Sequence, residues 1–453
     1  MKVIFFILPF YLFLFVFYGL KNPKGFLLLT GIFTIPFRTT YDFFTINSHS
    51  MGWTNSISLS LSDVSFFSLF LYLLLSGDLK GSKRNEISNS FFFFVIACIP
   101  SLINSSWTKI SFLAIVMLLK SYFLYYYVFI RSLTDFKVIE SVVDYFSFTI
   151  IFQGIFSIIQ FTTGNPLDFF STGRGAQGML KFGDTVLFNR AFGTVGKPNS
   201  FAAFIVPIIF ILLALYLFYP VKRKLRLFGL TLGLIALILS FSRGGWLSFA
   251  LALVFILFMA VRKGFLNFST VFKYGIVLTL LIIPFSPYIV TRIFGGDHNA
   301  ALSRIPLMKI SLNMFLEHPF VGVGINTFRS VIHHYTTSPD LKDIYLNEVH
   351  NQYLLILSEI GIIGLIFYLN FLYRIFKALI RSSSISSCDF CIYLGYGLSA
   401  GFFATLIHMN VDIFNSALNF HTLFMMAGLA TACIKLRKDP EPILEKRMGM
   451  QIV

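Results

Sequence analysis

The sequence predicts an all-α fold, a polytopic transmembrane bundle of about 12–13 spans. Of its 453 residues, 56% are hydrophobic and only 12% are charged, and the mean hydropathy is +0.79. A soluble chain carries about 25% charged residues. Apolar runs recur along the whole length with short polar stretches between them, so we expect one integral-membrane domain over residues 1–453. The first run lacks a small-residue cleavage pattern and is expected to stay in the membrane.

The placement of positive charge predicts the order and orientation of the spans. The net charge is +16, and the basic residues cluster in short connectors, which the positive-inside rule assigns to the cytoplasm. The clusters are Lys80/Lys83/Arg84, Arg131/Lys137, Lys222/Arg223/Lys224/Arg226, Arg262/Lys263, Arg374/Lys377/Arg381 and Lys435/Arg437/Lys438. The expected spans lie near residues 3–20, 25–37, 61–76, 90–103, 110–130, 138–161, 200–219, 226–241, 246–261, 271–290, 352–373, 391–409 and 414–434. No basic stretch is interleaved with exposed aromatics, so a nucleic-acid partner is not expected.

The remaining connectors form the outer face, and a cytoplasmic tail is expected over residues 435–453. The outer connectors are residues 38–60, 104–109, 162–199, 242–245, 291–351 and 410–413. All eight histidines fall in these loops or at the outer ends of spans, so any chemistry is expected to face outward. The alternative is that histidine is simply rare in short cytoplasmic connectors. The 162–199 loop, with Arg190 and Asn199 near its end, is a candidate lid or acceptor-binding loop.

Arg243 stands in a hairpin tip that is expected to lie below the outer membrane surface. The Ser242-Arg243-Gly244-Gly245-Trp246 turn joins two apolar runs of about 16 residues, which cover roughly 24 Å of a roughly 30 Å hydrocarbon core. A cation there is costly unless it is paired or binds an anion. The alternative is an arginine that reaches back to lipid phosphates.

Arg304 is expected in the first turn of an amphipathic helix on the outer surface. Ser303-Arg304-Ile305-Pro306 reads as a capped helix start, followed by apolar Leu307, Ile310, Leu312 and Met314, and the helix ends before His318-Pro319. A cation in the first turn opposes the helix dipole unless an anion binds both the arginine and the free backbone amides. Phosphate is the natural anion, and a solvated surface arginine is the alternative.

His350 closes the large outer loop at the threshold of a span, where it is a candidate general base. Glu348 could orient or replace it. At the end of span 391–409 and just after it, the polar residues His408, Asn410, Asp412 and Asn415 could bind sugar hydroxyls, although helix capping explains them equally well. The alternative for His350 is a packing residue. The sequence has no H-E-x-x-H, Walker A or G-x-S-x-G motif, and the Cys388-Asp-Phe-Cys391 pair has no partner pair, so no metal or cofactor is expected.

Three motifs together resemble the bacterial O-antigen ligase/polymerase family of membrane glycosyltransferases. They are Phe192-Gly193-Thr194 with Pro198-Asn199, the Ser242 to Trp246 turn, and the loop pattern from Arg304 through Pro319-Phe320-Val321-Gly322-Val323-Gly324 to His350-Asn351-Gln352-Tyr353-Leu354 and Glu359-Ile360-Gly361. The motifs cover about residues 190–365.

The resemblance implies a metal-independent, inverting transfer of a glycan from undecaprenyl diphosphate at the periplasmic face of the bacterial inner membrane. Arg243 and Arg304 match the arginines proposed to bind the leaving diphosphate, and His350 matches the histidine proposed to deprotonate the acceptor. Arg190, Asn199, Asn351, Glu348 and Asp412 are the expected substrate-binding residues. The acceptor is expected to be lipid A core for a ligase, or a lipid-linked glycan for a polymerase. A polysaccharide transporter or flippase is a more distant alternative, without a convincing internal repeat to support it.

Overall fold

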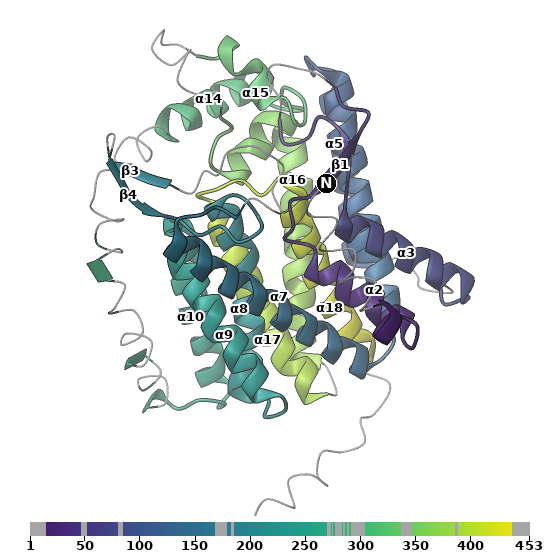
Figure 1. The fold of residues 1–453 in the computed structure, drawn as a ribbon. Coiled ribbons are helices and arrows are strands. Elements are labelled where there is room, and N and C mark those ends of the chain that lie inside the picture. The colour runs from purple at the N-terminus through teal and green to yellow at the C-terminus, as the bar shows by residue number, and fades with distance from the viewer. Residues whose placement is uncertain are drawn as a thin grey trace, which may run out of the picture.

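The computed structural model is a bundle of helices with two short hairpins at one end (Figure 1). It describes residues 15–46, 52–79, 85–167, 179–182, 185–269, 304–336, 347–385 and 388–436, with short stretches between residues 273 and 290. The predicted spans 3–20 and 271–290 lie largely outside the described residues, as do Ser303 and almost all of the predicted 435–453 tail.

Membrane-crossing helices confirm the predicted all-α, polytopic fold class. Within the described residues, seven helices are long and apolar enough to cross a membrane. They are the continuous α5–η3–α6 helix (Thr108–Tyr122, Phe123–Val128, Phe129–Ser132), α7 (Phe136–Thr163), α8 (Pro198–Phe218), α10 (Arg243–Arg262), α16 (Gln352–Ile385), α17 (Asp389–His408) and α18 (Ala417–Lys435). The chain is therefore a multi-pass membrane protein.

Shorter elements complete the bundle. The shorter apolar helices are α2 (Pro23–Phe33), α3 (Leu61–Leu75) and α4 (Glu86–Cys98), with η2 (Pro100–Leu102) directly after α4. The remaining helical segments are η1 (Phe15–Gly19), α9 (Arg223–Leu239), α14 (Arg304–Glu317), α15 (Phe328–Val331) and η6 (Ile332–His334). The hairpins pair β1 (Thr40–Phe43) with β2 (Ile57–Ser60) and β3 (Met179–Phe182) with β4 (Thr185–Asn189), both antiparallel, with Thr40 opposite Ser60 and Met179 opposite Asn189.

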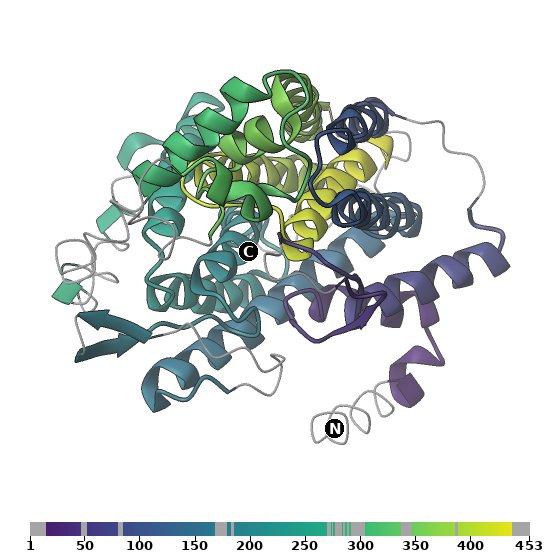
Figure 2. The ribbon, with the colours of Figure 1, turned by 90° about the horizontal axis from the view of Figure 1, so that it is seen from above.

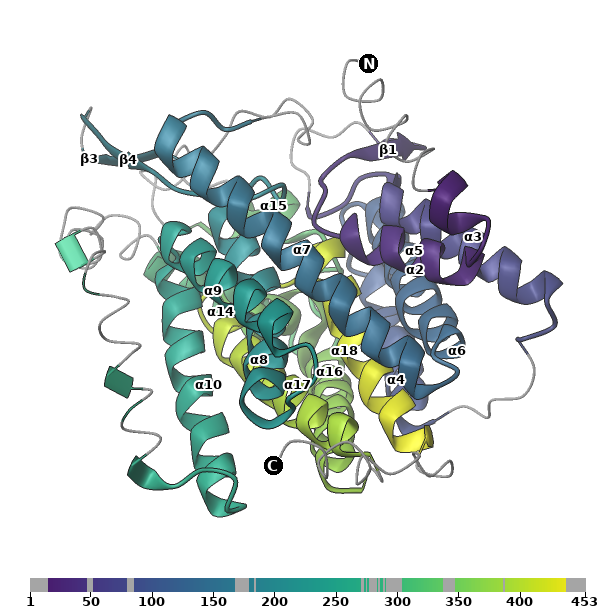
Figure 3. The same cartoon turned by 60° about the horizontal axis from the view of Figure 1, so that its bottom comes forward.

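The loops predicted to face outward gather at one end of the bundle, here called the loop end. Figure 1 shows α14, α15, β1 and the β3–β4 hairpin at this end, and Figure 2 looks down on it. The opposite end, here called the basic end, carries the connectors at 219–223 and 262–266 and the end of α18. Figure 3 shows the long α7 crossing the bundle diagonally, where it packs on α8 and α9.

Glycines let α17 lie against α8 at close range. A Cβ added at Gly397 would lie 2.7 Å from the Cα of Ile211, and one at Gly401 would lie 2.8 Å from the Cα of Pro207. This G-x-x-x-G spacing is a common means of close helix packing in membranes. It brings the end of α17 next to the start of α8, at the loop end.

A break in α16 joins this helix to the loop that follows α14. Gly361 has φ 71° and ψ −171°, so the helix is interrupted there, and its backbone groups pair with the loop instead. Val323 and Gly324 donate to the Ser358 and Glu359 carbonyls at 3.0 and 2.9 Å, and the Ile362 amide donates to the Pro319 carbonyl at 2.9 Å. Broken helices are tolerated at membrane depth only where protein groups satisfy the freed backbone.

The buried Glu359 carboxylate extends this connection to the first outer loop. It accepts hydrogen bonds from the Asn326 and Phe328 amides at 2.9 and 3.0 Å. The fully buried Asn326 side chain in turn accepts from the Trp53 amide at 2.6 Å and donates to the Thr54 carbonyl at 2.7 Å. Segments near residues 53, 326 and 359 are thus held together by one set of hydrogen bonds.

The N-terminal half anchors that first loop through a buried ion pair. Lys120 of α5 lies 2.8 Å from the carboxylate of Asp63 and also donates to the Ser58 carbonyl of β2 at 2.7 Å. Tyr125 donates to the other Asp63 oxygen at 3.0 Å. The sequence motifs gave this half no role beyond spanning the membrane, whereas here it supports a loop that contacts Asn326.

Replacing Gly361 with alanine is expected to destabilise the protein strongly. A Cβ there would lie 2.3 Å from the Phe320 carbonyl carbon, so the α16–loop connection would have to open. Gly264→Ala is the matched control, because Gly264 also has a positive φ (75°) but its Cβ would meet nothing within 4 Å. Both changes add about 1–3 kcal/mol of backbone strain, and Gly361→Ala adds about 1–3 kcal/mol or more from the overlap. Thermal unfolding in detergent measures the difference; equal Tm values for the two variants would contradict this account.

Candidate functional site

His350 and Asp412 form a pair at the loop end. His350 directly precedes Asn351, which caps α16, and its Nδ1 lies 3.4 Å from Oδ1 of Asp412, a long hydrogen bond. Asp412 follows α17 and is buried, and its Oδ1 also accepts from the Ile413 amide at 2.9 Å. Burial raises the pKa of Asp412, but the hydrogen bond from His350 and the charges of His408 and His350 together bring it below its ordinary value. An ionised Asp412 accepts the Nδ1 proton, which leaves the His350 Nε2 lone pair for a substrate proton.

Asn351 and Gln352 fix the position of His350. The Asn351 side chain accepts from the Tyr353 and Leu354 amides, both at 3.0 Å, and donates to the Asn410 carbonyl at 3.1 Å. Gln352 donates its backbone amide to Met409 at 2.8 Å. Asn351, predicted to bind substrate, is therefore placed as a helix cap that ties α16 to the 409–414 turn.

Glu348 lies two residues before His350 in the sequence, and its carboxylate is hydrogen-bonded to a different partner. Its buried carboxylate accepts from the Asn415 side chain at 3.0 Å, and the charges of Arg329, Lys197 and His350 act on it. Burial raises its pKa, and the Asn415 hydrogen bond and the nearby cations reduce this rise without cancelling it. Asp412, which the sequence indicated for sugar hydroxyls, contacts His350 where Glu348 was expected to do so.

Arg243 is the first residue of α10 and follows a tight turn. Phe241 has φ 48°, and the Ser242 side chain caps the helix by accepting from the Gly245 amide at 3.2 Å. A Cβ added at Gly244 would lie 2.8 Å from Val411 and 3.0 Å from His408. Only a glycine at this position lets the start of α10, with Arg243, approach the segment that carries Asp412.

Arg190 and Asn199, both predicted to bind substrate, bond to each other. The Arg190 guanidinium donates to the Asn199 side chain at 2.9 Å and to the Ser240 carbonyl at 3.0 Å. The neighbouring Ala191 amide donates to the Leu239 carbonyl at 2.8 Å. These bonds hold the start of α8 against the turn that leads to Arg243.

Arg304 begins α14 and is half-buried. Leu307, Ile310 and Met314 are buried as the amphipathic pattern predicted, whereas Leu312 is 43% exposed. The Ser311 hydroxyl donates to the Leu354 carbonyl at 2.9 Å, which fixes α14 on α16. Among the described residues Arg304 has no hydrogen bond or ion pair, and its charge acts on His408, the same residue that Gly244 contacts.

Sequence reasoning missed a second group of cations, Arg38, Lys197 and Arg329, which we call the second cation group. The charges of Arg38, Arg329, Glu348 and Asp412 all act on Lys197, and Gly196 packs against the Arg38 side chain. Lys197 reaches the surface, yet the protein around it and the charge of Arg38 lower its pKa. Arg329 Nε is buried without a hydrogen-bond partner in the described structure. Lys197 directly precedes the Pro198-Asn199 pair of the first motif, and this position is the one signal in the sequence that could have found it.

The fold and the site together define a multi-pass membrane protein with a histidine–aspartate pair and several cations at one end of its bundle. Residues 228–369 match the protein family described as O-antigen ligase. This segment contains Arg243, Arg304 and His350, and the match confirms the resemblance to the O-antigen ligase/polymerase family. No curated protein matches the chain.

Glu348→Gln is expected to raise the Tm of the protein, increasingly so as the pH rises. The folded-state pKa of Glu348 is raised, so the native state retains this proton longer than the unfolded state and loses stability as pH climbs above about 4.3. Glutamine cannot ionise and can still accept from Asn415. Thermal unfolding from pH 5 to pH 8 tests this, with the exposed Glu317→Gln as control. A Tm gain that stays constant or shrinks with pH would contradict it.

Proposed function

We propose that the chain is an O-antigen ligase-type glycosyltransferase that moves a glycan from undecaprenyl diphosphate to an acceptor sugar hydroxyl. The observation that carries the proposal is Arg304, a half-buried guanidinium without a described protein partner, beside the His408 end of α17 and within the matched segment. Such a cation is costly unless it binds an anion. The basic end would face the cytoplasm by the positive-inside rule, so the site would face the periplasm.

The proposed reaction is a direct displacement. His350 Nε2 takes the proton of the acceptor hydroxyl, and the acceptor oxygen forms a bond to the anomeric carbon while the bond from that carbon to the diphosphate oxygen breaks. Asp412 stabilises the imidazolium that results. Attack from the face opposite the leaving group inverts the anomeric centre.

Arg243 and Arg304 would stabilise the charge that grows on the leaving diphosphate. Each is the first residue of a helix, so the unpaired backbone amides of α10 and α14 add further donors for an anion. Donors placed in advance where charge develops are usually the largest contribution to such catalysis. The chemistry asks for no metal ion or cofactor.

The second cation group favours a second candidate, a polymerase that joins lipid-linked repeat units. A neutral sugar hydroxyl needs no cation, whereas a lipid-linked acceptor brings its own diphosphate. The charges of Lys197 and Arg329 act on Glu348, and the charge of Lys197 also acts on Asp412. The second cation group is therefore close to His350, the proposed base. It belongs to other elements of the fold than Arg243 and Arg304. Lipid A core remains the acceptor that the ligase assignment predicts.

Arg304→Ala and Arg243→Ala are each expected to lower glycan transfer by about 100-fold or more, the usual loss when a donor to a developing anion is removed. Lys309→Ala is the control, because Lys309 is an exposed cation on the same helix as Arg304. Transfer is measured on purified protein with EDTA present. Full activity in either arginine variant, or loss of wild-type transfer that a divalent metal restores, would refute the mechanism.

The acceptor is identified by supplying the donor alone or together with lipid A core. A ladder of lengthening lipid-linked chains from donor alone would establish the polymerase, and product only on lipid A core would establish the ligase. In a polymerase, Lys197→Gln with Arg329→Gln should raise the acceptor KM about tenfold, since a charge-assisted bond contributes about 1.5–3 kcal/mol. An unchanged acceptor KM would remove the second cation group from substrate binding.

A further inference from the structure

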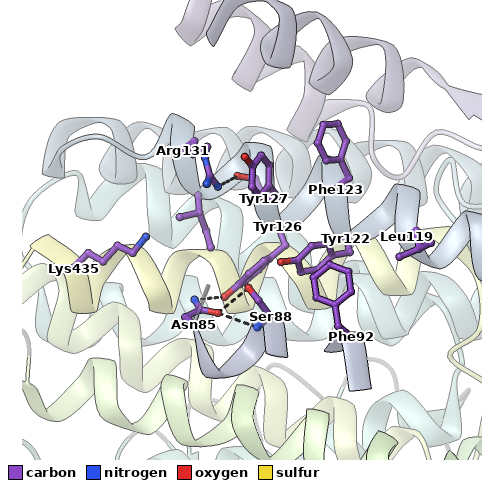
Figure 4. Close-up of a pocket in the computed structure, with 11 residues that line it drawn as sticks. Asn85, Ser88, Phe92, Leu119, Tyr122, Phe123, Tyr126, Tyr127, Arg131 and Lys435 are labelled. Carbon is purple, nitrogen blue, oxygen red and sulfur yellow. Dashed lines mark hydrogen bonds between the residues drawn. The ribbon is translucent and has the colours of Figure 1, made fainter. Parts of the chain in front are cut away.

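Three polar side chains around a cavity at the basic end bond to one another. The cavity, of about 340 Å³, lies between the start of α4, the α5–η3–α6 helix and the end of α18 (Figure 4). Asn85 donates to the Tyr126 hydroxyl at 2.6 Å and accepts from the amide and the hydroxyl of Ser88, both at 2.9 Å. A ligand would therefore find these three groups already paired. His408, at the loop end, differs from them in this respect.

His408 is a buried histidine whose ring has no hydrogen bond in the described structure. It is the last residue of α17 and is only 2% exposed. Its ring packs edge-on against Phe414, with 5.3 Å between the ring centroids. Among the described residues, neither ring nitrogen has a hydrogen-bond partner. A buried imidazole left in this way is costly, so we expect it to bond to a partner that the described part of the chain does not supply.

The surroundings of the His408 ring favour an anion as that partner. A Cβ added at Gly244 would lie 3.0 Å from His408 Nε2, so this nitrogen faces the first turn of α10. The first amides of a helix have no acceptor within the helix and carry a partial positive charge. The charge of Arg304 also acts on the ring. Asp412 acts on it as well, but its carboxylate already accepts from His350 and the Ile413 amide.

We infer that His408 donates a hydrogen bond from Nε2 to a diphosphate oxygen of the lipid-linked glycan, beside Arg304 and the first turn of α10. The inference rests on the proposed function and adds a third side chain to the two arginines. It assigns the imidazole to the diphosphate, where the sequence suggested sugar hydroxyls. A hydrogen bond to a charged phosphate oxygen is stronger than one to a neutral hydroxyl, and a helix N-terminus favours the same anion.

The turn over residues 408–412 would then hold the two sides of the reaction in a fixed relation. The His408 carbonyl accepts from the Val411 and Asp412 amides, both at 3.0 Å, which fixes this turn. Asp412 at its end supports His350, the proposed base for the acceptor hydroxyl. His408 at its start would bind the leaving diphosphate. A displacement needs the acceptor and the leaving group on opposite sides of the anomeric carbon, and one short turn sets that geometry in advance.

Binding of undecaprenyl diphosphate, the leaving group of the proposed reaction, tests the inference without any glycan transfer. Native mass spectrometry of the full chain in detergent gives the Kd. His408→Phe keeps a ring beside Phe414 but removes the N–H group, so we expect the Kd to rise about tenfold or more. His408→Gln keeps an N–H group near the position of Nε2 and should bind nearly as tightly as the wild type.

The order of these two variants separates a hydrogen bond from packing. If His408 served only to pack against Gly244, phenylalanine would replace it better than glutamine does. His408→Met is a second variant without an N–H group, and its flexible side chain decides the matter if the ring of His408→Phe lowers the Tm. Binding by His408→Phe or by His408→Met that is as tight as binding by His408→Gln would overturn the inference.

Two further variants keep this inference apart from the proposed function. His334→Phe makes the same change at an exposed histidine and should leave the Kd unchanged. Arg304→Ala should weaken binding whether or not His408 takes part. Weak binding by Arg304→Ala together with wild-type binding by His408→Phe and His408→Met would overturn the role of His408 alone. A wild-type chain that does not bind undecaprenyl diphosphate would overturn the proposed function, and this inference with it.

Discussion

The break in α16 at Gly361 is the constraint on which the arrangement at the loop end depends. A helix that stops and restarts within an apolar bundle exposes backbone groups that water cannot reach, and each must find a protein partner. Residues 319–324 supply those partners, and the Glu359 carboxylate takes two more amides from the same loop. Because Asn326 also binds the segment at Trp53, one set of hydrogen bonds joins the first outer loop, the large loop and the part of α16 that begins beside His350. The glycines on both sides are necessary, since a Cβ at Gly322 would lie 2.3 Å from the Glu359 carbonyl carbon.

The polar site rests on this frame, and its charges are arranged around two buried carboxylates. Asp412 is kept ionised by hydrogen bonds and neighbouring imidazoles, whereas burial pushes Glu348 toward its protonated form. The pKa values of two acids close to one histidine are therefore shifted in opposite directions, and the difference follows from their surroundings. Asp412 can support a charged imidazolium, while Glu348 is better suited to hold Asn415 by accepting its hydrogen bond. Environment separates their roles in the way expected of paired acids in enzyme sites.

The sequence was sufficient for the fold class, and it singled out the three residues on which the proposed mechanism rests. Hydropathy located most spans to within a few residues, and the costs of burying Arg243 and of placing Arg304 in a first turn made both of them candidates for anion binding. Asp412 could not be assigned to His350, because the pairing joins residues 62 positions apart through the Gln352–Met409 contact. The second cation group was hidden for the same reason, since Arg38, Lys197 and Arg329 come from three separate outer loops. Arg190 and Asn199 were singled out as substrate ligands, yet their mutual hydrogen bond places them as supports for the Arg243 turn.

Three helices begin beside this site with a cation at the start, which is opposite to what helix stability favours. Lys197 precedes the first turn of α8, and Arg243 and Arg304 open α10 and α14. A helix N-terminus carries a partial positive charge, so a cation there costs about 0.3–1 kcal/mol, and several together add mutual repulsion. A chain selected for stability alone would place acids at these positions. An anionic substrate would turn each of these unfavourable interactions into a favourable one, because the same amides and side chains would then face an opposite charge. Under the proposed mechanism, the free energy lost in the unliganded protein would reappear as affinity for the diphosphate, and more so as the leaving group gains charge.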